Sequence, residues 1–209
     1  MKRPLLLAHR GFSGNYPENS PLAFRMAVEK TAADGFESDV HITKDGKLVI
    51  FHDASVERTS NGTGFIKNMT YDELLSLDIG AWKSPEFAGQ HIWTFGQLLD
   101  FCKETKMLLN MELKNYEVFY ENLEQRVIDE ICKRQMQEQS GVLIGAFNQN
   151  RCSFPPSTIS PCSISRSCAR TLKPAFCMIS PIWTWNIMSS APMPTICIPG
   201  ICFCNISRS

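Results

Sequence analysis

Apolar residues along the first 150 positions fall into short runs separated by stretches of helical periodicity. Each run is bounded by polar or turn-forming residues, which is typical of a buried β-strand. The runs that we expect to form strands are 5–8, 36–42, 48–51, 107–113 and 142–147. The intervening stretches carry apolar residues three and four positions apart, most clearly over residues 117–139, and these predict amphipathic helices. Strands that alternate with helices are typical of a parallel α/β fold.

Side-chain caps mark where the predicted helices begin. Ser20 precedes a proline and predicts a helix that starts there and stops at Gly35. Capping boxes at 70–73 and 94–97 predict two further helix starts. The first of these boxes falls within a long, irregular excursion over residues 53–93.

The pattern accounts for part of a larger architecture. Five β units, one of them a tight strand pair around a turn at 44–46, fit within the first 150 residues. A parallel (β/α)8 barrel, the TIM barrel, of about 250 residues would continue with three more. Nothing after Asn150 continues the pattern. We therefore predict an α/β fold, an incomplete TIM barrel in which residues 1–150 form the barrel portion and residues 151–209 form an aberrant tail.

Composition separates the same two parts. The formal net charge of the chain is zero, but residues 1–150 hold all 21 acidic residues and 16 of the 21 basic ones. Residues 151–209 hold no acidic residue, seven of the nine cysteines and eight of the twelve prolines. The odd number of tail cysteines argues against a disulfide scaffold, and the lack of a nearby histidine argues against a zinc site.

Several function classes are disfavoured by charge and hydropathy. No basic stripe suggests binding to nucleic acid, and no apolar stretch reaches the length of about 18 residues that a membrane span needs. The apolar run that follows Met1 is too short for a signal peptide, and only two cysteines occur before residue 151. We therefore predict a cytoplasmic protein whose partner is a small molecule.

Three carboxylates lie in strand-like segments of the barrel portion. Glu37 and Asp39 are two residues apart on one strand, so their side chains point to the same face. Glu112 lies on another strand, between Asn110 and Lys114 on a shared face. Three carboxylates around one point would repel each other unless a cation neutralised them, and oxygen ligands select Mg²⁺ or Ca²⁺. The alternative is that these are solvated carboxylates at strand ends.

Two histidines each follow an apolar strand. His9 and His52 could serve as base and acid on opposite sides of a phosphorus atom, since imidazole exchanges a proton near neutral pH. Arg10 and Lys114 offer cationic donors for phosphoryl oxygens, or else form ordinary ion pairs with neighbouring carboxylates. The combination predicts metal-assisted cleavage of a phosphate ester.

Together these segments resemble the glycerophosphodiester phosphodiesterase family. The shared motifs occur in the family's order within the first 150 residues: His9-Arg10-Gly11, Pro17-Glu18-Asn19-Ser20, Glu37-x-Asp39-Val40, Thr43-x-Asp45-Gly46, His52-Asp53, Arg58-Thr59-x-Asn61-Gly62-x-Gly64, Asn110-x-Glu112-x-Lys114 and Phe147-Asn148. Each motif alone is weak, whereas their joint order and spacing are specific. The resemblance implies a TIM-barrel hydrolase of lipid and glycerol metabolism, which cleaves glycerophosphodiesters to sn-glycerol 3-phosphate and an alcohol.

The resemblance also implies a role for each candidate residue. The acid/base pair would be His9 and His52, the Mg²⁺ or Ca²⁺ ligands Glu37, Asp39 and Glu112, and the phosphate contacts Arg10 and Lys114. The family is thought to use attack by the substrate's own glycerol hydroxyl, so that no protein nucleophile is needed. One departure concerns packing rather than chemistry: the family's Ile-Pro-Thr-Leu-Glu-Glu reads Ile-Trp-Thr-Phe-Gly-Gln at 92–97.

Two alternatives stand beside this enzyme. Residues 151–209 lack strand or helix periodicity, which fits either a disordered tail or, as we favour, a frameshift in the gene. Reading the codons for 192–198 displaced by two bases permits a string that resembles a later barrel segment of the family. The chain would then be an inactive fragment whose sheet has two unpaired edges. The second alternative is another barrel phosphodiesterase, such as a phospholipase D-like enzyme.

Overall fold

A computed structural model describes Arg3, residues 5–115 and 117–136, and the backbone of strands at 142–146, 197–198 and 201–204. Apart from the strands at 197–198 and 201–204, the predicted tail over residues 151–209 lies outside the described residues. No helix in the described part is long and apolar enough to cross a membrane.

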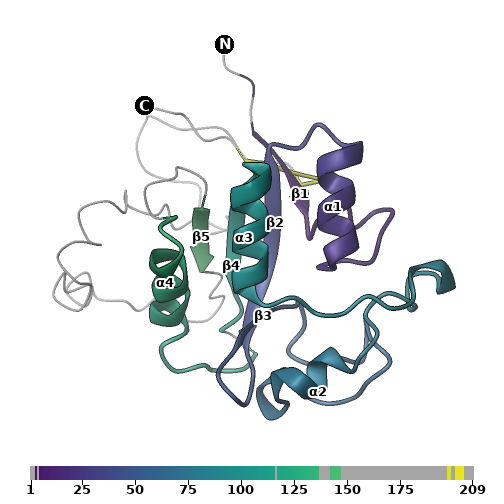
Figure 1. Ribbon diagram of the computed structural model, residues 1–209, viewed down its shortest axis with the longest axis vertical. Coiled ribbons are helices and arrows are strands. Elements are labelled where there is room, and N and C mark those ends of the chain that lie inside the picture. The colour runs from purple at the N-terminus through teal and green to yellow at the C-terminus, as the bar shows by residue number, and fades with distance from the viewer. Residues whose placement is uncertain are drawn as a thin grey trace, which may run out of the picture.

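A single mixed sheet forms the centre of the described structure (Figure 1). Its strands are β1 Leu5–His9, β2 Gly35–Ile42, β3 Leu48–Ile50, β4 Leu108–Leu113, β5 Val142–Ala146, β6 Cys197–Ile198 and β7 Ile201–Cys204. The strand order is β5-β4-β2-β1-β7-β6, with β3 paired to β2. The pairs β1–β2, β2–β4 and β4–β5 are parallel, as the alternation of strands and helices predicts.

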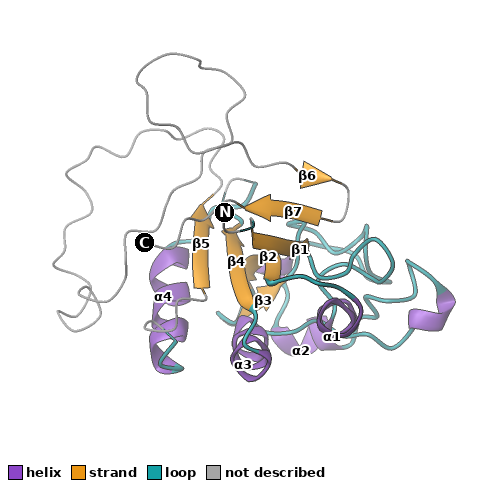
Figure 2. Ribbon diagram, turned by 90° about the horizontal axis from the view of Figure 1, so that it is seen from above, coloured by secondary structure: helices purple, strands orange, loops and turns teal. Residues whose placement is uncertain are grey.

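The helices that connect these parallel strands lie on one side of the sheet (Figure 2). They are α1 Pro21–Lys30, α3 Phe95–Thr105 and α4 Leu123–Lys133, while the short α2 Tyr71–Leu75 belongs to the irregular excursion. The excursion also holds two 3-10 turns, Ile66–Asn68 and Pro85–Phe87. Phe24 of α1, Phe36 of β2 and Phe95 of α3 are fully buried between the helices and the sheet. This one-sided arrangement is that of a barrel wall with its outer helical layer.

The three helix starts predicted from capping side chains are confirmed, whereas other predicted helix bounds are wrong. Side chains of Ser20, Thr70 and Thr94 cap α1, α2 and α3. The first helix ends at Lys30 rather than at Gly35, which instead opens β2. A Cβ at this glycine would lie 2.3 Å from the carbonyl oxygen of Leu108, so the close β2–β4 approach requires glycine there.

The long helix predicted over 117–139 is shorter at both ends: it ends at Lys133, and it begins only at Leu123 because a polar loop precedes it. The Asn115 side chain accepts a hydrogen bond from the Tyr120 backbone N–H at 2.6 Å. Asn122 then adopts a left-handed conformation, with φ at 58°, directly before α4 begins at Leu123. Helical periodicity cannot show where such a loop ends, since Val118 and Tyr120 are themselves buried.

Two short strands from the tail alter the expected sheet edges. An incomplete barrel was expected to leave two edges unpaired, but β7 pairs with β1 in antiparallel orientation, and Leu6 lies opposite Phe203. The β1 edge is therefore covered in this structure. This pairing differs in direction from the parallel neighbour that a closed barrel would supply.

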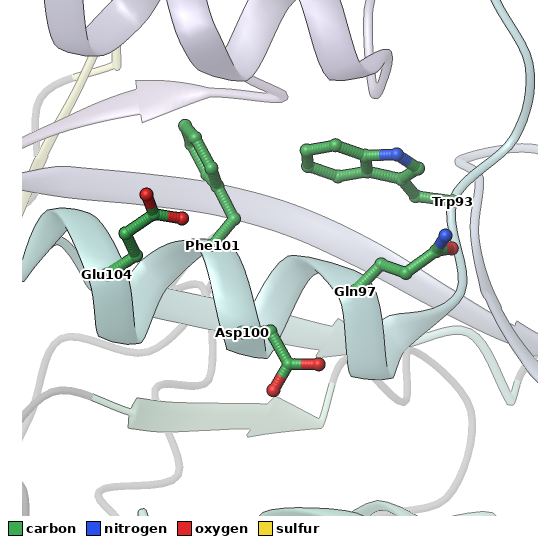
Figure 3. Close-up of a pocket in the computed structure, with 5 residues that line it drawn as sticks. All are labelled: Trp93, Gln97, Asp100, Phe101 and Glu104. Carbon is green, nitrogen blue, oxygen red and sulfur yellow. The ribbon is translucent and has the colours of Figure 1, made fainter.

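The departure from the family pattern at 92–97 is accommodated at the outer surface. The Trp93 ring stacks on Phe24 of α1 at a centroid distance of 6.1 Å and lies 5.6 Å from Phe101 of α3. A hollow beside α3 is lined by Trp93, Gln97, Asp100, Phe101 and Glu104; in Figure 3 the Asp100 side chain points away from the rings of Trp93 and Phe101. The Thr94 capping box remains intact, so the departure changes packing between α1 and α3 and leaves the helix start unchanged.

Candidate active site and metal centre

The three candidate carboxylates lie together on two neighbouring strands. Asp39 of β2 lies opposite Glu112 of β4, and His9 at the end of β1 lies opposite Glu37. One oxygen from each of the three carboxylates lies within 4.8 Å of the others. Glu37 and Asp39 lie inside β2 and are buried, as the strand predicted over 36–42 implies, so the alternative of solvated carboxylates at a strand end does not hold for them.

The electrostatics of this acidic triad suit a bound cation. Burial and the neighbouring charges of Asp39 and Glu112 hold the pKa of Glu37 well above its usual range. Asp39 is fully buried, and its Oδ1 atom forms an ion pair with Lys114 Nζ at 3.0 Å. Buried carboxylates that lie close together are costly unless cations compensate their charge. The donor set of three carboxylates therefore fits a hard divalent cation.

Lys114 lies among these carboxylates. Its Nζ atom is 3.0 Å from Asp39 Oδ1 and 2.8 Å from Glu112 Oε1, and only 4% of its side chain is exposed. Burial alone would lower the pKa of Lys114, but the two carboxylates outweigh it and raise this pKa. The structure therefore shows ion pairs of Lys114 with both carboxylates, and its contact with phosphate stays a prediction.

The two histidines differ in their partners. His9 Nε2 lies 3.7 Å from Glu37 Oε2, and burial, aided by the charge of Arg10, lowers the pKa of His9 and favours its neutral form. His52 follows β3, and its Nδ1 atom lies 2.5 Å from Asp53 Oδ1. This contact fixes the proton on Nδ1, since an ionised carboxylate can only accept.

Arg10 leaves β1 through a strained turn. Its backbone is left-handed, with φ at 55°, and its N–H donates to the Glu37 carbonyl oxygen at 2.9 Å. The Arg10 guanidinium pairs with Glu18 at 3.0 Å and lies 3.5 Å from Asp39 Oδ2. Such strain is typical of functional sites, where surrounding contacts hold a side chain in one direction.

Several residues at the site were not predicted to have a role. Asn19 donates to Asp39 Oδ2 at 2.9 Å, and Glu18 lies between Arg10 and Arg58. The motifs at 17–20 and 58–64 contain them and carry part of the family resemblance. No spacing rule, however, assigns a contact to loop residues so far apart in sequence.

His41 is a further unpredicted residue, buried behind His52. Its Nε2 atom lies 3.1 Å from the His52 carbonyl oxygen and its Nδ1 atom 3.0 Å from the Tyr120 hydroxyl. Because the carbonyl can only accept, Nε2 carries the proton and Nδ1 accepts from Tyr120. Burial lowers the pKa of His41 to about 4, so this histidine stays neutral. A histidine within an alternating strand gives no sequence signal for such a contact.

Comparisons with known proteins agree with this geometry. The model of the glycerophosphoryl diester phosphodiesterase family matches residues 9–153. A glycerophosphodiester phosphodiesterase from Caldanaerobacter subterraneus subsp. tengcongensis is 41% identical over 146 residues, which are 70% of this chain and 59% of the relative. The chain thus spans about three fifths of that relative's length.

Solved structures extend the comparison to the fold. A glycerophosphodiester phosphodiesterase from Agrobacterium tumefaciens is 28% identical, with a TM-score of 0.59, over 69% of this chain and 57% of the other. An Oleispira antarctica phosphodiesterase in complex with its product sn-glycerol-3-phosphate is 32% identical, with a TM-score of 0.58, over 68% and 57%. These neighbours are TIM barrels, and the described parallel sheet is part of such a barrel. The chain belongs to the glycerophosphoryl diester phosphodiesterase family.

Proposed function

We propose that the protein hydrolyses glycerophosphodiesters to sn-glycerol 3-phosphate and an alcohol. The observation that carries the proposal is the meeting of the acidic triad with His9 across β1, β2 and β4. Membership of the family and the product complex of the Oleispira relative support this substrate class. A cytoplasmic location remains a prediction from the sequence.

Each residue has a proposed part in the reaction. Glu37, Asp39 and Glu112 would hold Mg²⁺ or Ca²⁺, which would neutralise charge that develops on the phosphoryl oxygens. We assign proton transfer to His9 and His52: one accepts the proton of the attacking glycerol hydroxyl, and the other donates a proton to the departing alkoxide. The attacking oxygen bonds to phosphorus as the alcohol oxygen leaves, which gives a cyclic glycerol phosphate and consumes no protein nucleophile. Water then attacks the same phosphorus, passing a proton to one imidazole, while the bond to the hydroxyl oxygen that attacked first breaks and this oxygen regains a proton, which leaves sn-glycerol 3-phosphate.

Arg10 and Lys114 would have different parts in binding the phosphate. Arg10, held by Glu18, is proposed to contact a phosphoryl oxygen, since a guanidinium binds phosphate through directed donors. Lys114 is proposed to contact the phosphate once the substrate binds beside the carboxylates. Before substrate binds, its two ion pairs hold Asp39 and Glu112 side by side.

The test measures release of glycerol 3-phosphate from glycerophosphocholine by the purified chain, with Mg²⁺ or Ca²⁺ added in turn. Activity should disappear with a chelator and in His9→Ala, while His91→Ala, which changes an exposed histidine of the excursion, should match the wild type. Activity that survives His9→Ala would reject the assigned site. A chain that binds the divalent ion yet releases no product would instead support the alternative of an inactive fragment.

A further inference from the structure

A continuous series of charged contacts joins Arg10 to His52. Arg10 Nη1 donates to Glu18 Oε1 at 3.0 Å, and Arg58 Nη2 donates to the same oxygen at 2.7 Å. Arg58 in turn donates to Asp53, whose Oδ1 atom accepts from His52 Nδ1. From Arg10 to Asp53, positive and negative groups alternate along the series, so each charge has a neighbour of opposite sign.

Arg58 is suited to the centre of this series because a guanidinium can donate along two edges. One edge meets both Glu18 oxygens, with Nη1 at 3.0 Å from Oε2 and Nη2 at 2.7 Å from Oε1. The other edge meets both Asp53 oxygens, with Nε at 2.6 Å from Oδ2 and Nη2 at 3.1 Å from Oδ1. These two bidentate pairs fix the planes of the Arg58 guanidinium and of both carboxylates.

Glu18 is more enclosed than Arg58. Its side chain is 13% exposed, against 46% for Arg58. Burial alone would raise the pKa of Glu18, but the hydrogen bonds from Arg58 and the charge of Arg10 outweigh burial and lower that pKa. Glu18 therefore stays charged, which keeps both arginines attached to it.

We propose that Glu18 and Arg58 are positioning residues, which together set the directions of the Arg10 guanidinium and the His52 imidazole toward one reacting phosphate. The inference rests on the proposed function for its phosphate, but its geometry does not. Loops bring the series together from residues 8 and 40 positions apart. Neither Glu18 nor Arg58 needs to touch substrate, because each acts through a neighbour that does.

The closing experiment uses the full chain labelled with ¹⁵N-histidine and compares ring signals. Glu18→Gln keeps the side-chain shape and removes the charge, while Arg58→Lys keeps the charge and removes the second edge of donors. The matched controls are Glu29→Gln and Arg25→Lys, which make the same changes on the exposed face of α1. We expect both site variants to shift the His52 ring signals, although Glu18 does not contact His52, and both controls to leave them unchanged.

Kinetics give the second measurement. Glycerol 3-phosphate release should fall about tenfold in kcat/KM in each site variant, and the double variant should lose no more than the worse single one, since both break one series. His52 signals that stay unchanged in Glu18→Gln would overturn the proposal. If Arg58→Lys fails to fold, Glu18→Gln alone decides it. A wild type without activity would count against the proposed function only, because the ring signals still decide the positioning roles.

Discussion

Replacing Lys114 by methionine tests which charge holds the acidic triad together. The side chain keeps its aliphatic length and loses its ammonium group. Asp39 and Glu112 then lose a cation that lies 3.0 Å from one and 2.8 Å from the other. Without added metal, we expect the folded state to lose stability, because the fully buried Asp39 charge loses its nearest compensation.

The size of the loss follows from burial. Removing one partner of a buried ion pair costs about 3–5 kcal/mol, and the lower end applies here because the Glu112 side chain is 25% exposed. A loss of about 3 kcal/mol lowers the melting temperature of a chain of this size by roughly 6–12 °C. A divalent ion at about 100 times its Kd would return about 2.7 kcal/mol, so metal should stabilise Lys114→Met at least as much as the wild type.

The assay is a series of thermal melts with a chelator and with increasing Mg²⁺ or Ca²⁺. The matched control is Lys133→Met, which removes an exposed lysine from α4 and should leave both the melting temperature and its metal dependence unchanged. Removing a positive charge beside a cation site should also shift the metal titration to lower concentration. The reasoning is refuted if Lys114→Met melts with the wild type in chelator and responds to metal at the same concentration.

Three further predictions concern stability. The pKa of His41 is about 4 in the folded state and 6.5 when the side chain is exposed, so the unfolded state binds the extra proton between these pH values. The free energy of unfolding should therefore fall by about 3 kcal/mol as pH drops from 6.5 to 4. Urea titrations of His41→Gln should show a flatter pH profile over that range. Gly11→Ala should cost about 1–3 kcal/mol, measured by the urea midpoint, because φ is 77° and the new Cβ would lie 2.8 Å from the Ala23 backbone. Phe24→Ala should cost about 3–5 kcal/mol in the same assay, since Phe24 is fully buried against Phe36, and a change below about 1 kcal/mol would contradict the described core.

The strands were readable from the sequence because the helices bury one face of the sheet and leave strong apolar runs. Short polar side chains at helix starts were equally readable, since Ser20, Thr70 and Thr94 cap through contacts three residues away. The helix ends were not, because they depend on tertiary contacts. Gly35, for example, serves the approach of β2 to Leu108 and does not end α1.

The acidic triad could be anticipated in part. The spacing of Glu37 and Asp39 places both on one face of β2, but only the strand register places Glu112 opposite Asp39. The same register explains why the strand-end interpretation was wrong. The sequence predicts both the strand over 36–42 and the turn at 44–46, and the hairpin with β3 carries β2 three residues beyond Asp39.

The contacts that sequence reasoning missed share a physical cause: they join loops whose relative positions exist only in the folded chain. Arg58 reaches Glu18 across 40 positions, and His41 reaches Tyr120 across 79. Motif spacing identifies groups that approach a substrate from strand ends, where the barrel architecture fixes their direction. Residues that aim those groups lie on connections of variable length, and their roles follow from distances rather than from pattern. Substitution of His9 or His52 removes a reacting group and so tests only the chemistry of the site. A structural comparison of Glu18→Gln with Glu29→Gln tests whether this chain also fixes the orientation of the groups that contact the phosphate.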